Sequence, residues 1–173
     1  MTTALLVFAA LIFFVGACLL IAQFLSLFTG APFVPSSNAR VERMLALAAI
    51  RPGMRVADLG SGDGRIVIAA AAAGAIAEGW EANPLLVWWS RLSIWRRGLS
   101  GRACIHHGSY RGQDFRAHDR LFLYVLVKEM ARIEQWLPAA IGPKTQVIVH
   151  AFPFPTWTPG QKDGTLYRYQ LPV

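Results

Sequence analysis

Cysteine is scarce in this sequence: the 173 residues include only Cys18 and Cys104. No pair of residues has the spacing of metal ligands, and two distant cysteines make no disulfide framework. We therefore expect no metal site and a domain that works in a reducing compartment. An internal repeat and a nucleophile–base pair are also missing, so nothing in the pattern indicates covalent catalysis.

A basic low-complexity run is absent too, although the net charge is +7. A positive surface suits nucleic acid, anionic lipid or an acidic protein. Without a basic arm, nucleic acid is not an expected partner. Seven arginines between residues 91 and 120 are accompanied only by Asp114 and Asp119. They form either a solvated surface or a face held against an anionic leaflet.

Charged residues are missing altogether from residues 4–28. As a helix this run would be roughly 37 Å long, enough to cross a hydrocarbon core of about 30 Å. No Lys or Arg precedes the run, and it is too long for a cleaved signal peptide. A buried helix of a soluble fold is the remaining alternative. We predict a transmembrane anchor over residues 1–29, a domain over residues 30–173, and the lipid bilayer as a partner through residues 4–28.

The arginines nearest to the apolar run, Arg40 and Arg43, follow it in the chain. Positive charge is enriched on the cytoplasmic side of membrane-spanning segments. The sequence therefore predicts a single-pass membrane protein whose catalytic domain is cytoplasmic.

Short apolar strands alternate with helical segments after residue 38. The strand patterns lie at residues 55–59, 76–81, 103–107, 120–126, 146–152 and 165–171. The helical patterns between them include a segment at 128–137 that Pro138 should end. This alternation predicts an α/β fold with a doubly wound, mostly parallel sheet.

The helix expected from Pro84 carries an apolar stripe. The stripe consists of Leu85, Trp88, Leu92 and Trp95, which repeat at helical spacing. Large aromatic side chains in such a stripe usually pack in a core or at a membrane interface rather than serve as a platform for a ligand. We expect them to pack in the core.

A glycine-rich turn joins the first strand to the next helix. In VADLGSGDGR the strand ends near Asp58, and glycines follow at 60, 62 and 64. Glycine permits positive φ and close approach of a ligand to the backbone, and ligands of open α/β sheets bind at this end of the strands. Asp58 can accept hydrogen bonds from a ligand ammonium group, and Asp63 can complement the helix dipole.

An acid also ends the second strand: Glu81 lies in GWEANP, 17 residues after Gly64. A carboxylate there can bind both hydroxyls of a ribose. Folds that bind dinucleotides carry G-x-G-x-x-G, whereas this turn has G-x-G-x-G between Asp58 and Asp63. Because those acids would repel a pyrophosphate and attract a sulfonium, the pattern argues against NAD.

DLGSGDGR followed by WEANP resembles the class I, seven-stranded S-adenosylmethionine-dependent methyltransferases. FVPSS, LFLYVL and HAFPFPTW resemble one branch of that superfamily, which holds archaeal protein-lysine methyltransferases and the mitochondrial lysine methyltransferases for adenine nucleotide translocase and the c-subunit of ATP synthase. The resemblance covers residues 32–171. It implies a Rossmann-like methyltransferase fold and S-adenosyl-L-methionine as the cofactor.

The resemblance assigns the methionine part of the cofactor to the glycine turn. Asp58, Gly60 and Gly62 would hold it, and Ser61 and Asp63 belong to the same cofactor-binding turn.

Four further positions follow from the resemblance. Glu81 would bind the ribose, Ser36 would contact the cofactor from the N-terminal side, and Tyr124 would line the substrate channel beside the methyl group as the catalytic aligning residue. Ser109 stands where many relatives have an acid for the adenine amine, and its hydroxyl can accept one hydrogen bond.

Two departures from the branch concern other segments. Val127-Lys128 stand where the fourth-strand motif usually runs into proline. The segment between Trp157 and Thr165 is short, so one edge strand should be reduced or missing.

Methyl transfer from a sulfonium is a direct displacement, which requires alignment and exclusion of water. The branch and the anchor together predict N-methylation of lysines in a membrane-associated protein. Two alternatives stay open: methylation of a lipid or small apolar molecule, and a non-catalytic cofactor-binding scaffold.

Overall fold

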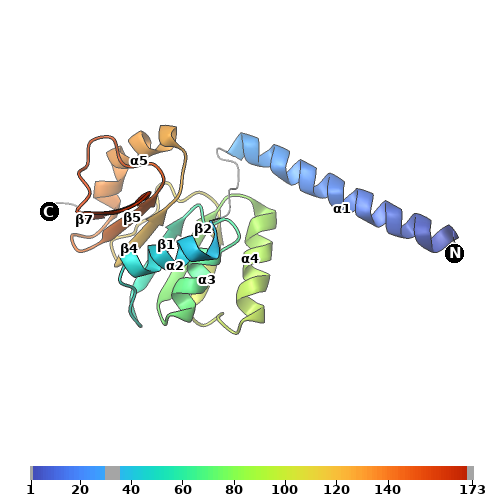
Figure 1. Cartoon of the computed structure of the whole chain (residues 1–173), viewed down its shortest axis with the longest axis horizontal. Coiled ribbons are helices and arrows are strands. Elements are labelled where there is room, and N and C mark those ends of the chain that lie inside the picture. Colours follow the sequence, from blue (N-terminus) through green and yellow to red (C-terminus); the bar gives the residue numbers. More distant parts are fainter. Residues whose placement is uncertain (1, 30–35, 171–173) are drawn as a thin grey trace. The chain divides into compact units, whose positions relative to one another are not determined.

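The computed structural model describes residues 2–29 and 36–170. The chain divides into two units, Met1–Val34 and Pro35–Val173 (Figure 1). Residues 33–35 of the FVPSS motif and Leu171 of the last predicted strand lie outside the described residues.

The first unit contains one helix, α1 (Thr2–Thr29). The prediction of a transmembrane helix at residues 4–28 is wrong: across the described residues, no helix is both long enough and apolar enough to cross a membrane, which takes about 20 consecutive apolar residues. The predicted localisation as a single-pass membrane protein with a cytoplasmic domain is wrong for the same reason, and the predicted bilayer contact through residues 4–28 has no support.

The second unit is built on a seven-stranded sheet in the order β3-β2-β1-β4-β5-β7-β6. Strands β1 to β5 are parallel, and β7 and β6 are added antiparallel at one edge. Their bounds are β1 (Arg55–Leu59), β2 (Ile76–Glu81), β3 (Ala103–His107), β4 (Arg120–Leu123), β5 (Gln146–His150), β6 (Gln161–Asp163) and β7 (Leu166–Gln170). The predicted α/β class and the mostly parallel sheet are therefore confirmed.

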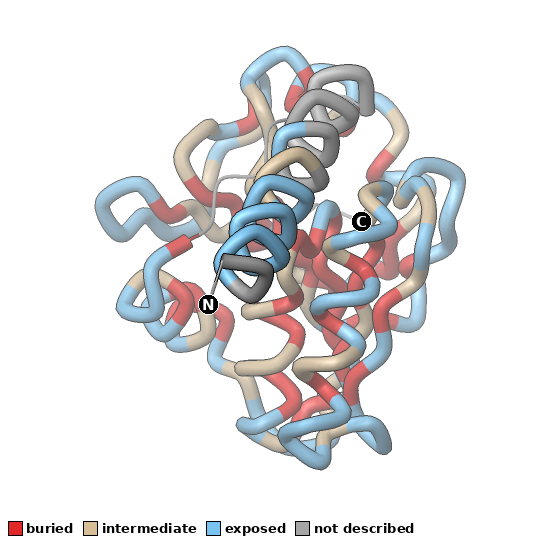
Figure 2. Tube along the Cα trace, turned by 90° about the vertical axis from the view of Figure 1, so that its right-hand side faces the viewer, coloured by how far each residue is buried: buried red, intermediate tan, exposed pale blue. Residues whose placement is uncertain are grey.

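Helices cover both faces of this sheet (Figure 1), and the buried residues gather in the interior of the domain (Figure 2). They are α2 (Asn38–Leu47), α3 (Arg65–Ala72), α4 (Pro84–Arg96) and α5 (Val127–Ala140). Residues of α2, α3 and α4 share one buried cluster with Phe122 and Ile148, whereas α5 packs in a second cluster with Leu121 and Val147. Adjacent residues of β4 and β5 thus point to opposite faces, as strand geometry requires.

The chain order reverses at β1, which pairs with β2 on one side and with β4 on the other. At such a switch point the connections leave the carboxyl ends of neighbouring strands in opposite directions, which opens a crevice for a ligand. The predicted site residues after β1, β2 and β4 all belong to this edge.

Several predicted boundaries differ from the structure; β5, for instance, ends at His150 rather than at residue 152. β4 ends at Leu123 rather than at residue 126, because Leu126 is the extended N-cap residue of α5. α5 continues past Pro138 to Ala140, since a proline this near the end of a helix disrupts few of its hydrogen bonds. The expected reduced edge strand is β6, which has three residues.

The expectation that the α4 stripe packs in the core is wrong for its tryptophans. Trp88 and Trp95 are 62% and 69% exposed. The helix instead buries Val87, Ser90 and Ile94 against the sheet. Hydrophobic residues occur on two faces of α4, so helical spacing alone could not show which of them faces inward.

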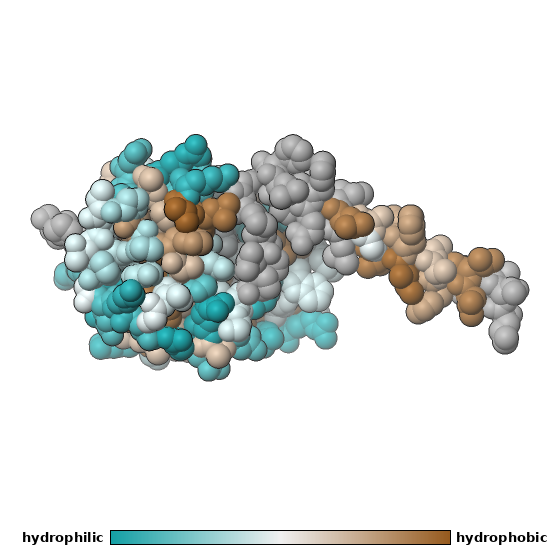
Figure 3. All heavy atoms as spheres, turned by 45° about the horizontal axis from the view of Figure 1, so that its top comes forward, coloured by the Kyte–Doolittle hydropathy of each residue, from teal (hydrophilic) through white to brown (hydrophobic). Residues whose placement is uncertain are grey.

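Exposed arginines of this unit are partly paired with acids. Arg116 binds Asp114 at 2.6 Å and Arg43 binds Asp163 at 2.7 Å, with all four side chains about half exposed or more. The face seen in Figure 3 is largely hydrophilic around a small apolar patch. The Arg116 pair fits the solvated-surface interpretation of the arginines between residues 91 and 120, and such exposed pairs contribute little to stability.

Candidate active site

The glycine turn after β1 is fastened to the neighbouring strand. Gly60 and Gly62 have φ of 84° and 56°, a region that side chains with a Cβ rarely adopt. The backbone N–H groups of Gly60 and Ser61 donate to the carbonyl of Trp80 at 2.9 and 3.0 Å. The turn therefore has a fixed shape beside the end of β2.

Glu81 closes this turn from β2. Its Oε2 accepts the backbone N–H of Gly62 at 2.9 Å, and its Oε1 accepts that of Asn83 at 2.7 Å. Its carbonyl accepts the N–H of Gly108 at 2.8 Å, which brings the loop carrying Ser109 to the same edge. The structure thus brings together the predicted residues after β1, β2 and β3.

Asp58 is 4% exposed at the end of β1. Burial, followed by the negative charges of Glu81 and Asp63, raises the pKa of its carboxyl to about 8. Ionising a buried acid among other acids is unfavourable unless a cation comes to it. The site is therefore electrostatically prepared for a positively charged ligand.

Asp63 is already paired in the structure. Arg65 donates to its Oδ1 at 2.8 Å and to its other oxygen, and the same guanidinium donates to the carbonyl of Ser36. Ser36 is 4% exposed. The ion pair gives Asp63 a positive partner and ties the start of the described domain to the glycine turn, so Asp63 is a weaker candidate for a cationic ligand than Asp58.

Ser109 and Tyr124 lie at different parts of the edge. Ser109 is exposed, and its hydroxyl oxygen accepts the N–H of Arg111 at 3.0 Å. Tyr124 follows β4 and its ring centroid lies 4.2 Å from that of His150, the last residue of β5. Tyr124 is therefore two strands away from Glu81, with β1 between them.

His150 was not singled out from the sequence. It is 4% exposed, and its Nδ1 is buried without a hydrogen-bond partner among the described residues. Burial, with a smaller contribution from the charge of Arg40, lowers the pKa of the ring to about 4. The available signal was its position in HAFPFPTW at the end of the fifth strand, the edge where ligands bind.

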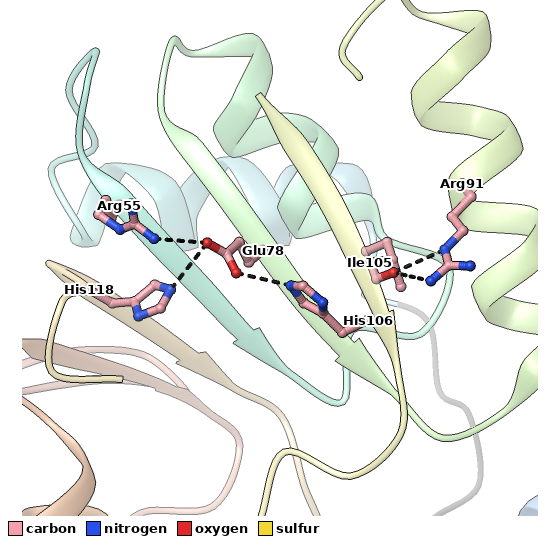
Figure 4. A network of polar contacts seen from close by, with 6 residues as sticks. All are labelled: Arg55, Glu78, Arg91, Ile105, His106 and His118. Carbon is pink, nitrogen blue, oxygen red and sulfur yellow. Dashed lines mark hydrogen bonds and ion pairs between the residues drawn. The ribbon is translucent and has the colours of Figure 1, made fainter. Parts of the chain in front are cut away.

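A second polar cluster lies on β2 away from this edge (Figure 4). Glu78 accepts from Arg55 at 3.0 Å and contacts His106 Nε2 at 3.0 Å. Glu78 lies three positions before Glu81, in the middle of β2, so the cluster belongs to the sheet rather than to the turn. Among the described residues, no group of three acids, histidines or cysteines is placed to hold a metal ion.

We predict that Gly79→Ala destabilises the fold at the turn. A Cβ at Gly79 would lie 2.6 Å from Ser61 Oγ, 2.7 Å from Ser61 Cβ and 2.8 Å from Ile105 Cδ1. Overpacking of this kind costs about 1–3 kcal/mol, measurable as a lower midpoint of urea unfolding. The control is Gly101→Ala, where an added Cβ meets nothing within 4 Å. Equal midpoints for the two variants would contradict the assigned contact.

Comparison with known proteins shows which family the chain belongs to. The model of the ANTKMT methyltransferase domain matches residues 58–161, more than half of the chain. The chain belongs to the ANTKMT methyltransferase family. This confirms the resemblance drawn from the glycine turn and the branch motifs.

Two curated relatives and one solved structure are similar to this member of the ANTKMT family. The lysine N-methyltransferase for the c-subunit of ATP synthase from Rattus norvegicus is 38% identical over 81% of this chain and 66% of its own length. The protein-lysine N-methyltransferase of Saccharolobus islandicus is 30% identical over 81% and 93%. An RNA methyltransferase from Salinibacter ruber in complex with S-adenosyl-L-homocysteine is 33% identical over 80% and 94%, with a TM-score of 0.77. The chain thus spans somewhat less than two thirds of the rat relative.

Proposed function

We propose that this chain is an S-adenosylmethionine-dependent methyltransferase that N-methylates lysine side chains of a protein. The observation that carries the proposal is the pair of acids at the switch point: buried Asp58 and fixed Glu81 on either side of a glycine turn. The named relatives support lysine as the acceptor, because the rat and archaeal proteins are both lysine N-methyltransferases.

The residues at this edge fit such a cofactor. Asp58 would pair with its ammonium group, and the turn at 60–62 would lie against its methionine part. Glu81 would release the backbone N–H groups that it now binds and accept hydrogen bonds from the two ribose hydroxyls. Ser109 would offer one acceptor to the adenine amine, and Ser36 would border the site from the N-terminal side. The hydroxyl of Ser61, which has no hydrogen-bond partner among the described residues, is a further polar group inside the turn.

S-adenosylmethionine, when bound, supplies an electrophilic methyl group on a sulfonium. The chain has to align an amine nitrogen with that carbon and keep water away. A nitrogen–carbon bond forms as the sulfur–carbon bond breaks, S-adenosylhomocysteine leaves, and the amine releases a proton to solvent. Tyr124 is the proposed aligning residue beside the methyl group, and the desolvated surroundings favour the neutral amine.

The test is transfer of a radiolabelled methyl group by the full chain into an extract from cells that lack it. We expect the label to follow protein, to be lost on protease digestion and to resist nuclease and lipid extraction, with methyl-lysine found by mass spectrometry. Label removed by nuclease would instead support RNA, the substrate class in the name of the Salinibacter protein. Label in the lipid extract would support a lipid or small apolar acceptor, and binding without any transfer would support a scaffold.

A further inference from the structure

His150 occupies the acceptor side of the proposed site. The strand order β2-β1-β4-β5 puts Glu81, the glycine turn, Tyr124 and His150 in a row along the carboxyl edge. Neighbouring strands are about 4.8 Å apart. If the cofactor spans β2 and β1, the ends of β4 and β5 are left for the incoming amine. His150 is the titratable residue at the end of β5.

The ring of His150 has an unsatisfied polar atom where such an amine would arrive. The residue is 4% exposed, and Nδ1 has no hydrogen-bond partner among the described residues. Leaving a buried polar atom unpaired costs about 1–3 kcal/mol, and native proteins rarely tolerate it without a reason. The Tyr124 ring at 4.2 Å covers one side of the imidazole through a tilted contact, which provides packing but no hydrogen bond.

The backbone after His150 is held in an uncommon conformation. Ala151 has a φ of 71°, which is unfavourable for a residue with a Cβ. It is fixed there because its N–H donates to the carbonyl of Thr165 at 2.8 Å, and the N–H of Phe152 donates to the carbonyl of His150 at 3.0 Å. The imidazole is therefore carried by a rigid segment, as a group that orients a substrate should be.

We propose that Nδ1 of His150 accepts a hydrogen bond from the methyl-accepting amine and so positions its lone pair toward the methyl group. This inference rests on the proposed function. A neutral amine has two N–H groups and one lone pair, so donating one N–H to a fixed acceptor restricts the direction of the lone pair. His150 takes no proton in this step; the proton of the ammonium product goes to solvent.

The surroundings keep the ring in the state that this role needs. Burial first, and the charge of Arg40 second, lower the pKa of His150 to about 4. At neutral pH the imidazole is uncharged, so it accepts a hydrogen bond and does not repel the cofactor. Because the unprotonated nitrogen is set by the tautomer, the role assigns the ring proton to Nε2.

The test compares acceptor-free and acceptor-bearing replacements in the full chain. His150→Leu and His150→Phe remove the acceptor, whereas His150→Asn keeps one near the position of Nδ1. We expect kcat for the labelled protein acceptor to fall at least tenfold in the Leu and Phe variants and less than threefold in the Asn variant. Calorimetric affinity for S-adenosylmethionine should stay within twofold in all three. The control is His118→Leu, which removes another buried histidine whose Nε2 lies 3.9 Å from Glu78 Oε1 outside the site, and this change should leave kcat unchanged.

The possible outcomes distinguish a failure of the role of His150 from a failure of the proposed function. An unchanged kcat in the acceptor-free variants, or an equal loss in the Leu and Asn variants, would overturn the role of His150 while methyl transfer itself stands. If the unaltered chain binds the cofactor but labels no acceptor, the proposed function fails and this inference fails with it. Thermal unfolding of each variant is measured first, and Phe replaces Leu in the comparison if the Leu variant does not fold.

Discussion

Asp58→Asn should weaken S-adenosylmethionine binding about thirtyfold or more at pH 8.5. The carboxylate is the group proposed to pair with the ligand's ammonium, and a hydrogen bond between charged groups is worth about 1.5–3 kcal/mol. Asparagine keeps the size of the side chain and one oxygen acceptor but loses the charge. Since Asp58 is 4% exposed, water cannot replace the lost interaction.

The same variant should lose the part of the pH dependence of binding that comes from Asp58. In the free protein the pKa of Asp58 is raised to about 8, so near pH 7 the carboxyl is mostly protonated and binding of a cation has to release that proton. Affinity of the unaltered chain should therefore rise with pH, by about tenfold per unit well below pH 8, and pass through a maximum near pH 8, because the ligand loses its ammonium proton above that pH. Affinity rises with pH in this range because the ionised form of Asp58 is the form that binds the ligand.

Calorimetry in two buffers with different ionisation enthalpies measures this proton directly. Near pH 7 the unaltered chain should release close to one proton on binding, and Asp58→Asn should not release this proton. The ligand's own amino group titrates near pH 8, but it does so with both proteins, so the difference isolates Asp58. Affinity that is independent of pH in the unaltered chain would show that Asp58 is not the group that pairs with the ligand.

The central strands were predictable because their signals are local. The bounds of β1, β2 and β3 coincide with the predicted ones, since each is a short apolar run between a turn and a glycine or charged residue. The position of the site followed from the same segments: a glycine turn after one strand and an acid at the end of the next must meet at one edge of a parallel sheet. The hydrogen bond from the backbone N–H of Gly62 to the carboxylate of Glu81 shows that these two segments meet at this edge.

What the sequence did not reveal depends on contacts between distant segments. The side of α4 that faces the sheet could not be read from a helix with apolar residues on two faces. The pairing of Asp63 with Arg65, and the link from Arg65 to Ser36, require the start of the domain to fold over the turn. His150 is buried beside Tyr124 only because β5 lies next to β4. The prediction of a membrane span over residues 4–28 rested on composition alone and was wrong.

Replacing Glu81 by alanine should lower the affinity for S-adenosylmethionine at least tenfold, or about 1.4 kcal/mol. Two effects act together. The ribose hydroxyls lose a charged acceptor, and the N–H groups of Gly62 and Asn83 lose the oxygens that hold them at 2.9 and 2.7 Å. The second effect loosens the turn before any ligand binds, so the variant should also unfold at a lower temperature.

Glu81→Gln separates the two effects, because a glutamine oxygen can still hold one of the two N–H groups while the charge is gone. If ribose binding is the main role, Glu81→Gln should lose much of the affinity for S-adenosylmethionine but little thermal stability. The matched control is Asp163→Ala, which removes an acid whose side chain is 48% exposed and which pairs with Arg43 outside the site. That change should leave the affinity within twofold. Unchanged cofactor affinity in Glu81→Ala would remove the ribose assignment, and an affinity that falls only in step with stability would make Glu81 a structural support of the glycine turn.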